Sequence, residues 1–320
     1  MLDPKGLRIL VELNSRGTIT AVAEALAFSL SAISQRLAQL EIAAGVPLTE
    51  RVGRRLLLTE AGQRLVAHAT GILAKMEEAE TELELLSGSV SGVLRIASLE
   101  TTLGTVLPKA LPVMERRYPN LKIETQEMDP EVAIPALIRG SFDAILIDDY
   151  RYMRRSRPPE LILFPLCSDP ILIAFPVEHV LAGEQQEFNL GDLASEVWIS
   201  TNAGSEFSEL HAYVCSTFGG FRPDVRHRTD NFGVSLALVA NGCGLALVPG
   251  LATLFAPPGV VFRRPADFST DRTVCFAIRE TSSARPALTA FQGVLEEVAA
   301  NLKLAPPKND SRMAATSLAP

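Results

Sequence analysis

A long proline-free segment constrains this chain more than any other feature of its sequence. Between Thr59 and Leu86, apolar side chains recur at alternating spacings of four and three residues. They are Leu65, Ala69, Ile72, Met76, Ala79, Leu83 and Leu86. Such a repeat predicts a helix that packs along another helix. At about 1.5 Å per residue it spans roughly 40 Å, which is long for a helix folded onto its own domain.

This helix has two possible partners. It can dock on another part of the same chain, or it can pair with the same helix of a second copy. We favour pairing, which makes the protein a homodimer or a homotetramer. The residues predicted for dimerisation are Leu65, Ile72, Met76, Leu83 and Leu86. Segment 59–88 is then a dimerising linker between a unit at 1–58 and a larger one at 92–302, and the polar tail 303–320 is expected to be disordered.

Charge is divided unevenly between the two units. Residues 1–64 hold eight Lys and Arg against six Asp and Glu, whereas the rest of the chain holds 22 against 31. A mildly basic unit thus precedes an acidic one, and only the first needs to contact phosphates. No apolar run is long enough to span a membrane, and the N-terminus lacks the pattern of a secretory signal. We expect a cytoplasmic protein without a membrane partner.

The first unit shows the pattern of short helices packed on a small core. Leucines at helical spacing mark a first helix, which the turn residues 14–17 end. Thr18 or Thr20 is expected to cap the second helix, because its hydroxyl can accept a free backbone N–H. By the same argument Ser29 is expected to cap a third helix that begins at Leu30.

The third helix has a buried stripe and a polar face. Ile33, Leu37 and Leu40 share the buried side, and the Ser, Gln and Arg side chains on the other side suit a major groove. Residues 45–58 then predict a β-hairpin with arginines at its tip, where they hold phosphates or enter a minor groove. The predicted DNA-binding residues are Thr18, Thr20, Ser29, Leu30, Ser31, Ser34, Gln35, Arg36, Gln39, Arg51, Arg54 and Arg55. On periodicity alone, an interaction bundle with a solvated arginine face is the alternative.

Residues 17–41 resemble the helix-turn-helix of LysR-type transcriptional regulators. The stretch runs from Gly17-Thr-Ile-Thr-Ala-Val-Ala to Gln-Leu-Glu41, and three motifs follow at the family's spacings: Gly45-Val-Pro-Leu, Arg51-Val-Gly-Arg-Arg and Leu58-Thr-Glu-Ala-Gly62. The resemblance implies a winged helix-turn-helix that binds double-stranded DNA, a dimerising linker helix and a contact with RNA polymerase. Two departures lie on the groove-facing side: Leu30-Ser31 replaces the usual Gln-Pro, and Gln35-Arg36 the usual Arg-Gln. The operator sequence therefore cannot be taken from relatives.

From residue 92 the sequence alternates between strand and helix patterns. The expected strands are 93–97, 121–125, 142–147, 171–175, 197–199, 245–248 and 273–278. The expected helices include 101–118, 130–139 and 286–302. Alternation of this kind predicts an α/β fold in which helices flank a parallel sheet. The late return to a strand and a helix predicts a chain that leaves one sheet, builds a second and comes back, which makes two lobes with a ligand cleft between them.

The same region is similar to the effector-binding domain of LysR-type regulators. The motifs that carry the similarity are Gly92-Val-Leu-Arg-Ile-Ala, Tyr118-Pro-Asn-Leu, Gly140-Ser-Phe-Asp-Ala-Ile-Leu, Leu193-Ala with Trp198-Ile, and Val239-Ala-Asn-Gly-Cys-Gly-Leu-Ala-Leu-Val-Pro249. The resemblance implies the two-lobed type 2 fold of periplasmic solute-binding proteins, with a small-molecule effector in the cleft. Lobe I is then expected at about 92–165 and 268–302, and lobe II at about 166–267.

The ligand is expected at the ends of strands. Open sheets bind ligands at the carboxyl ends of parallel strands, where helix N-termini present free amides, and equivalent positions line the effector site of the family. The predicted effector-binding residues are Ser98, Thr101, Thr102, Asp129, Ser200, Thr201, Asn202 and Phe232. The alternative is that Ser, Thr and Asn at such junctions serve only as helix caps.

The sequence gives no indication of an enzyme. It contains no G-x-S-x-G, P-loop or H-E-x-x-H motif, so we expect no catalytic residues, cofactor or metal. The cysteines Cys167, Cys215, Cys243 and Cys275 are far apart, which favours reduced thiols in the core. A redox sensor acting through Cys167 or Cys243, or a bare small-molecule binding module, is the alternative. A transport solute-binding protein is disfavoured, because no signal segment is found and the first unit is basic.

Overall fold

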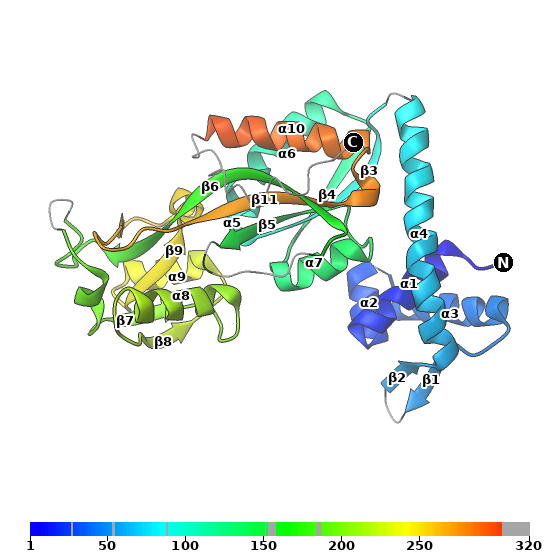
Figure 1. The fold of residues 1–320 in the computed structure, drawn as a ribbon, viewed down its shortest axis with the longest axis horizontal. Coiled ribbons are helices and arrows are strands. Elements are labelled where there is room, and N and C mark those ends of the chain that lie inside the picture. Colours follow the sequence, from blue (N-terminus) through cyan, green and yellow to red (C-terminus); the bar gives the residue numbers. More distant parts are fainter. Residues whose placement is uncertain are drawn as a thin grey trace.

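The computed structural model describes residues 1–26, 28–52, 55–87, 89–150, 152, 158–183 and 187–302. It has three parts: an N-terminal helical unit, one long helix, and a larger α/β domain (Figure 1). Arg54 and the predicted tail 303–320 lie outside the described residues, as does the side chain of Arg55.

The N-terminal unit is the predicted winged helix-turn-helix. Its helices are α1 Pro4–Arg16, α2 Ile19–Leu26 and α3 Leu30–Ala44, and its hairpin pairs β1 Thr49–Val52 with β2 Arg55–Leu58 in antiparallel register. Local chemistry sets the helix ends. The backbone N–H of Gly6 donates to the Asp3 carboxylate at 3.0 Å, Gly17 ends α1 at φ 72°, and Ser29 caps α3. Glycine adopts that left-handed conformation without steric cost.

The predicted linker is α4, Glu60–Ser87. The Thr59 hydroxyl accepts from the backbone N–H of Gly62 at 3.0 Å and donates to the Pro47 carbonyl at 2.9 Å, which fixes the start of α4 against the hairpin. A Cβ at position 62 would stand 2.1 Å from the Leu48 carbonyl oxygen, so only glycine fits this close approach. None of the helices in the described ranges is long and apolar enough to cross a membrane.

The apolar stripe of α4 divides between two environments. Ala69 is fully buried and Leu65 packs beside it in the core of the N-terminal unit, so that part of the stripe docks on its own chain. Leu65 is only partly buried there, and its predicted role in dimerisation stays a prediction. Further along, Ile72 is 41% exposed and Leu83 66% exposed, which leaves the rest of the stripe uncovered.

The larger domain is built on mixed sheets rather than on the purely parallel sheet that alternation predicted. The strand order is β4-β3-β5-β11-β6-β9-β7-β8, with β10 also on β6. Strands β3, β4 and β5 are parallel, as are β7, β8 and β9, but β6, β10 and β11 pair antiparallel. The bounds are β3 Gly92–Ser98, β4 Leu121–Glu127, β5 Ala144–Tyr150, β6 Leu161–Pro176, β7 Val197–Ser200, β8 Asp224–Arg228, β9 Leu245–Pro249, β10 Val260–Arg263 and β11 Asp271–Arg279.

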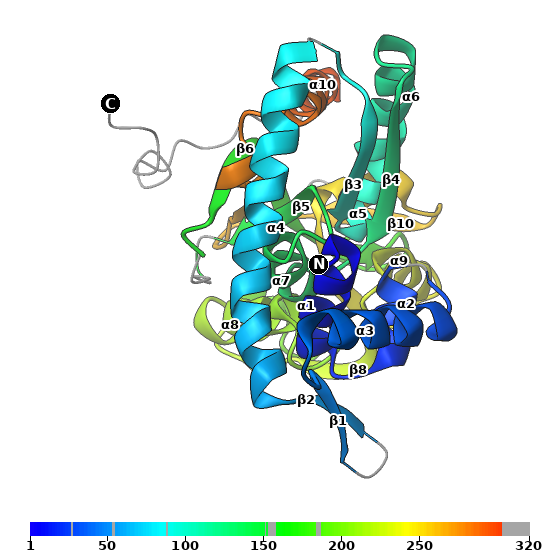
Figure 2. The ribbon, with the colours of Figure 1, turned by 90° about the vertical axis from the view of Figure 1, so that its right-hand side faces the viewer.

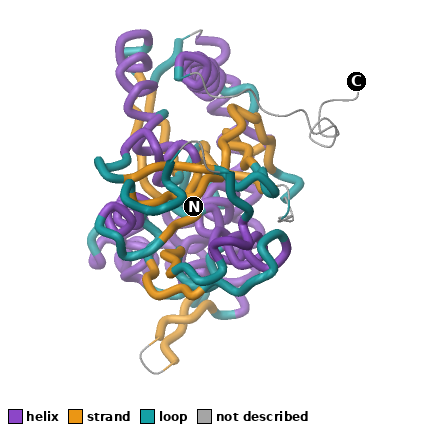
Figure 3. Tube along the Cα trace, turned by 90° about the vertical axis from the view of Figure 1, so that its left-hand side faces the viewer, coloured by secondary structure: helices purple, strands orange, loops and turns teal. Residues whose placement is uncertain are grey.

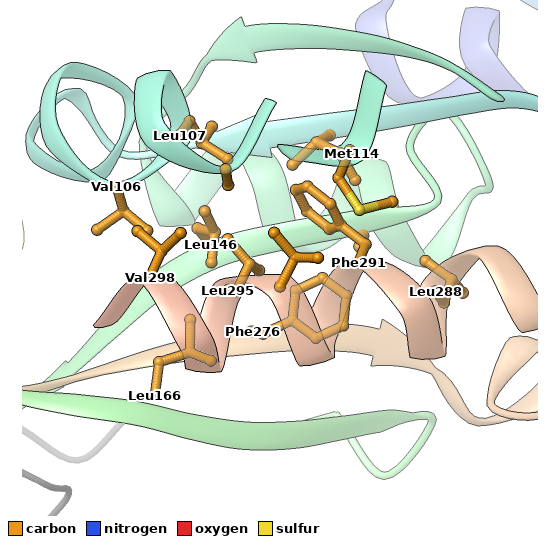
Figure 4. Close-up of a cluster of buried hydrophobic side chains, with 14 of the residues drawn as sticks. Val106, Leu107, Met114, Leu146, Leu166, Phe276, Leu288, Phe291, Leu295 and Val298 are labelled. Atoms are coloured by element: carbon orange, nitrogen blue, oxygen red, sulfur yellow. The ribbon is translucent and has the colours of Figure 1, made fainter. Parts of the chain in front are cut away.

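Lobe I packs helices on both faces of its sheet. The expected helix at 101–118 is divided into α5 Glu100–Thr105 and α6 Leu107–Arg117, because Pro108 lacks the N–H that would continue α5. The other helices are α7 Pro130–Ile138 and α10 Pro286–Asn301. Phe276, Leu146 and Phe291 meet between the sheet and the helices α6 and α10 (Figure 4).

Lobe II is joined to lobe I by two long strands. β6 pairs with β11 up to Pro170 and with β9 from Ile171, so one continuous strand serves both lobes. The other elements of lobe II are α8 Glu206–Thr217, α9 Phe232–Ala240 and the short 3-10 helices Leu190–Leu193 and Gly250–Phe255. A third short 3-10 helix, Glu280–Ser282, belongs to lobe I, between β11 and α10. A second core forms around Trp198 and Phe175. The hairpin β1–β2 projects from one end of the molecule in both side views (Figures 2 and 3).

Candidate DNA-binding face and effector cleft

Helix α3 presents the predicted polar face. Ile33, Leu37 and Leu40 are buried, and the opposite side carries the exposed residues Ser31, Ser34, Gln35 and Gln39. Leu30 is 51% exposed at the start of the helix. The amide of Gln35 and the hydroxyl of Ser34 are therefore free to reach base edges, and Leu30 can contact a thymine methyl group.

Several predicted contacts also stabilise the unit itself. The Arg36 guanidinium lies 3.5 Å from the Asp3 carboxylate and 5.8 Å from the Phe28 ring centroid, which holds it at the edge of the polar face. The Thr18 hydroxyl accepts from the N–H of Ala21 at 3.2 Å, so Thr18, not Thr20, caps α2. Both threonines are exposed.

Ser29 and the wing border the same face. The Ser29 hydroxyl accepts from the N–H of Ala32 at 3.2 Å and lies 3.0 Å from the Ser31 hydroxyl. On the hairpin, Arg51 is exposed. The roles predicted for Arg54 and Arg55 remain predictions, because their side chains are outside the described residues.

A buried ionic network lies where the two lobes meet. The Arg272 guanidinium, 2% exposed, donates to Asp169 at 2.8 Å, to Asp148 at 2.9 Å and to the Thr101 hydroxyl at 2.7 Å. The Tyr150 hydroxyl adds a bond to Asp148 at 2.6 Å. Burial opposes the charge on Arg272, but Asp169, Tyr150 and Asp148 outweigh burial and raise its pKa. Burial, reinforced by Asp148, also raises the pKa of Tyr150, so its hydroxyl stays protonated and donates.

The cleft beside this network is strongly acidic. Among the described residues, its cavity of about 100 Å³ is lined by one arginine, Arg272, and by seven carboxylates. These are Glu100, Glu127, Asp129, Glu131, Asp148, Glu206 and Asp230. Burial raises the pKa of Asp129, and the neighbouring carboxylates add to the rise. Three aromatic side chains, Tyr150, Phe207 and Phe232, line the same cavity, and Phe207 packs edge-on against each of the other two.

Glu100 crosses between the lobes. It begins α5 in lobe I, and its carboxylate accepts from the N–H of Phe232 at 2.7 Å and of Gly233 at 3.4 Å, at the first turn of α9 in lobe II. A helix N-terminus presents free amides that attract anions. Here the chain's own carboxylate occupies them. Burial raises the pKa of Glu100, and the two backbone hydrogen bonds counteract part of that rise.

The structure brings together half of the predicted effector-binding residues. Thr101, Asp129, Thr201 and Phe232 line the cleft. The other four are Ser98, Thr102, Ser200 and Asn202.

Those four are not among the residues that line this cavity, and their role in effector binding stays a prediction. Ser98 and Thr102 are fully buried and their hydroxyls lie 2.7 Å apart. Ser200 is held 3.0 Å from Nδ1 of His211, whose pKa burial lowers to about 4, with a smaller contribution from Arg228. The backbone N–H of Asn202 donates to Asp230 at 2.8 Å. These contacts are local, and none of them is the helix cap that the alternative anticipated.

Sequence reasoning missed the charged residues of the network. Asp148 and Tyr150 follow the apolar run of a predicted strand, and Arg272 directly precedes another. A charged residue bordering an apolar run is a weak sign of a buried ion pair, and nothing in the sequence names its partner. Among the described residues, no cluster of three or more side chains could hold a metal ion.

The cysteines are mainly part of the core. Cys167, Cys215 and Cys275 are buried and Cys243 is half-buried. Burial raises the pKa of Cys167 and of Cys215 to about 12. Because the thiolate is the form that reacts with oxidants, these two thiols are poorly suited to sensing them.

Comparison with known proteins assigns both parts of the chain. Residues 4–63 match the model of the bacterial regulatory helix-turn-helix protein, lysR family, and residues 87–300 match that of the LysR substrate binding domain. The chain belongs to the LysR family of transcriptional regulators. It is a DNA-binding regulator with an effector-binding domain, and the winged-helix and α/β fold classes predicted from the sequence are confirmed.

Relatives align over most of this LysR-family chain. ShiR of Corynebacterium glutamicum (strain R) is 31% identical over 75% of this chain and 83% of its own. The transcriptional activator HcaR of Escherichia coli (strain K12) is 27% identical over 92% of this chain and 98% of its own. Among solved structures, a full-length OxyR variant from Pseudomonas aeruginosa has a TM-score of 0.66 at 20% identity, covering 93% of this chain and 95% of that one. Full-length BenM has a TM-score of 0.57 at 21% identity, covering 96% and 100%.

Proposed function

We propose that this regulator binds double-stranded DNA as a homodimer, through α3 and the wing, and that a small molecule in the interlobe cleft controls it. The acidic cleft spanned by Glu100 is the observation that carries the sensing role, because a ligand there contacts both lobes. A change in lobe geometry is transmitted through α4 to the paired DNA-binding units. We expect a coupling free energy of about 1–3 kcal/mol between effector binding and DNA binding. Because its target is DNA, we place the protein in the cytoplasm. We also propose RNA polymerase as a further partner.

Sequence readout is assigned to the free polar face of α3. Gln35→Ala removes a side chain able to form a bidentate contact with adenine, so we expect binding to the operator to weaken by about 5- to 150-fold, or about 1–3 kcal/mol. Affinity for unrelated DNA should stay the same, because phosphate contacts are unchanged. Fluorescence anisotropy at fixed salt with the gene's own upstream region measures both.

Gln126→Ala is the matched control for this readout. Gln126 is exposed on β4 of lobe I, and its replacement should leave both affinities unchanged. Equal weakening on operator and unrelated DNA by Gln35→Ala would show that α3 does not read bases.

The charge of the cleft determines which effectors it favours. Arg272 is already neutralised by two carboxylates, and Glu100 already occupies the amides at the start of α9. A carboxylate effector would meet repulsion from the remaining acids, whereas an amine or guanidinium would be attracted, and the three aromatic rings can contact its cationic head. We propose a cationic effector.

A thermal-shift screen of the full chain with matched amines and carboxylates tests this charge preference. Amines that bind should raise the melting temperature. Asp129→Asn should lower the affinity for these amines by about tenfold, because one negative charge is lost. Glu296→Gln, on the outer face of α10, should leave that affinity unchanged. Stabilisation by carboxylates alone would overturn the cationic assignment.

A further inference from the structure

A second cavity lies where the DNA-binding unit meets the effector domain. It has a volume of about 280 Å³ and is enclosed by α1, α4 and lobe I. In Figure 1, α1 and α4 lie beside lobe I, on the opposite side of the molecule from the elements of lobe II. The charged side chains on its wall are the basic Lys5, Arg8, Arg95, Arg279 and Arg285, and the acidic Glu77, Glu80 and Asp143.

Two of the three acids are engaged by arginines of lobe I. The Arg279 guanidinium donates to Glu77 at 2.9 Å, and Arg285 donates to Asp143 at 2.8 Å. Asp143 also accepts the backbone N–H of Arg95 at 2.7 Å. These two carboxylates and the arginines that bind them therefore largely neutralise one another.

Arg8 is placed differently from the other arginines. It reaches from α1 to lobe I, where its guanidinium donates to the Gly140 carbonyl, and among the described residues it forms no ion pair with a carboxylate. Burial lowers the pKa of Arg8, Arg279 and Arg95 lower it further, and Asp143 and Glu77 act in the opposite direction. A half-buried guanidinium without a carboxylate in contact is a natural partner for an anion, since guanidinium groups bind oxyanions with two parallel hydrogen bonds.

Thr81 supplies an independent sign of a ligand. Its side chain on α4 is 4% exposed and lines the cavity, yet its hydroxyl has no hydrogen-bond partner among the described residues. Buried polar groups are nearly always paired. An anion oxygen in the cavity would accept the hydrogen bond that the Thr81 hydroxyl has available.

We propose that this junction cavity binds a small oxyanion of the phosphate class, held by Arg8 of α1 and Thr81 of α4, with Lys5 at its mouth. Such an ion would join the DNA-binding unit, the linker helix and lobe I at one point. It would favour the arrangement in which α1 is docked on lobe I, and so link the DNA-binding unit to the concentration of the ion. The inference is independent of the effector cleft, which lies between the lobes.

Isothermal titration of the full-length protein with inorganic phosphate, at constant ionic strength and with chloride as the reference anion, tests the site. Wild type should bind phosphate saturably. Thr81→Val keeps the shape of the side chain and removes only the hydroxyl, so it should fold normally and bind at least tenfold more weakly. Arg8→Gln should abolish binding.

Two matched variants guard against general effects. Thr70→Val changes an exposed threonine on the same helix, and Arg116→Gln an exposed arginine on α6; both should bind phosphate like wild type. A phosphorylated metabolite that competes with phosphate would identify the source of the oxyanion. Absence of saturable phosphate binding by wild type, or equal binding by wild type and Thr81→Val, would overturn the proposal.

Discussion

Replacing Arg272 by methionine is expected to lower the free energy of unfolding by about 3–5 kcal/mol, because removing one partner of a buried ion pair leaves the other uncompensated. Arg272 is 2% exposed, and the variant strands the buried Asp148 and Asp169 together. Thr101 also loses its bond to the guanidinium. Urea denaturation of the full chain, followed by the fluorescence of Trp198, measures the loss.

The network itself supplies the control for this variant. Adding Asp148→Asn and Asp169→Asn to Arg272→Met removes the stranded charges and should recover a large part of the stability. Arg226→Met replaces an exposed arginine whose side chain is 61% accessible, and it should change stability by less than about 0.5 kcal/mol. If Arg272→Met behaves like Arg226→Met, the network does not stabilise the domain.

Leu83→Glu is expected to weaken self-association by at least about 100-fold, because a dimer loses one buried leucine from each copy and gains two buried charges. Leu83 is 66% exposed on α4, on the same side as Ile72 and Met76, which are 41% and 39% exposed. Operator affinity should fall with it, since a monomer contacts one half-site. Sedimentation velocity and DNA titration measure the two effects.

Leu85→Glu is the matched control for dimerisation. It places the same charge on the same helix, at a leucine that is 50% exposed but points to a different side, because two residues along a helix turn by about 200°. It should leave the dimer intact. A monomeric Leu85→Glu together with a dimeric Leu83→Glu would assign the interface to another face.

Local sequence chemistry accounts for the helices and the hairpin of the N-terminal unit. Ser29 and Gly17 bound helices because a cap needs only a side-chain acceptor or a positive φ within a few residues. The motifs from Gly17 to Gly62 were enough to identify the family, since they lie in one continuous stretch.

Sequence periodicity could not distinguish the two uses of α4. The same apolar spacing places Leu65 against the chain's own core and leaves Leu83 exposed. A hydrophobic pattern shows that a face will be buried but not what covers it, and here the start of α4 is fixed by Thr59 and Gly62 against the hairpin.

The sequence by itself determined the family, the order of the parts and the faces of the recognition helix, because each depends on residues close together in the chain. Only the tertiary structure decided the chemistry of the cleft. Arg272 meets Asp148, 124 residues away, through the pairing of β11 with β5. The same folding buries Ser98 and Thr102 and pairs their hydroxyls with each other. Which charges neutralise one another depends on distances across the sheet, and no spacing along the chain encodes them.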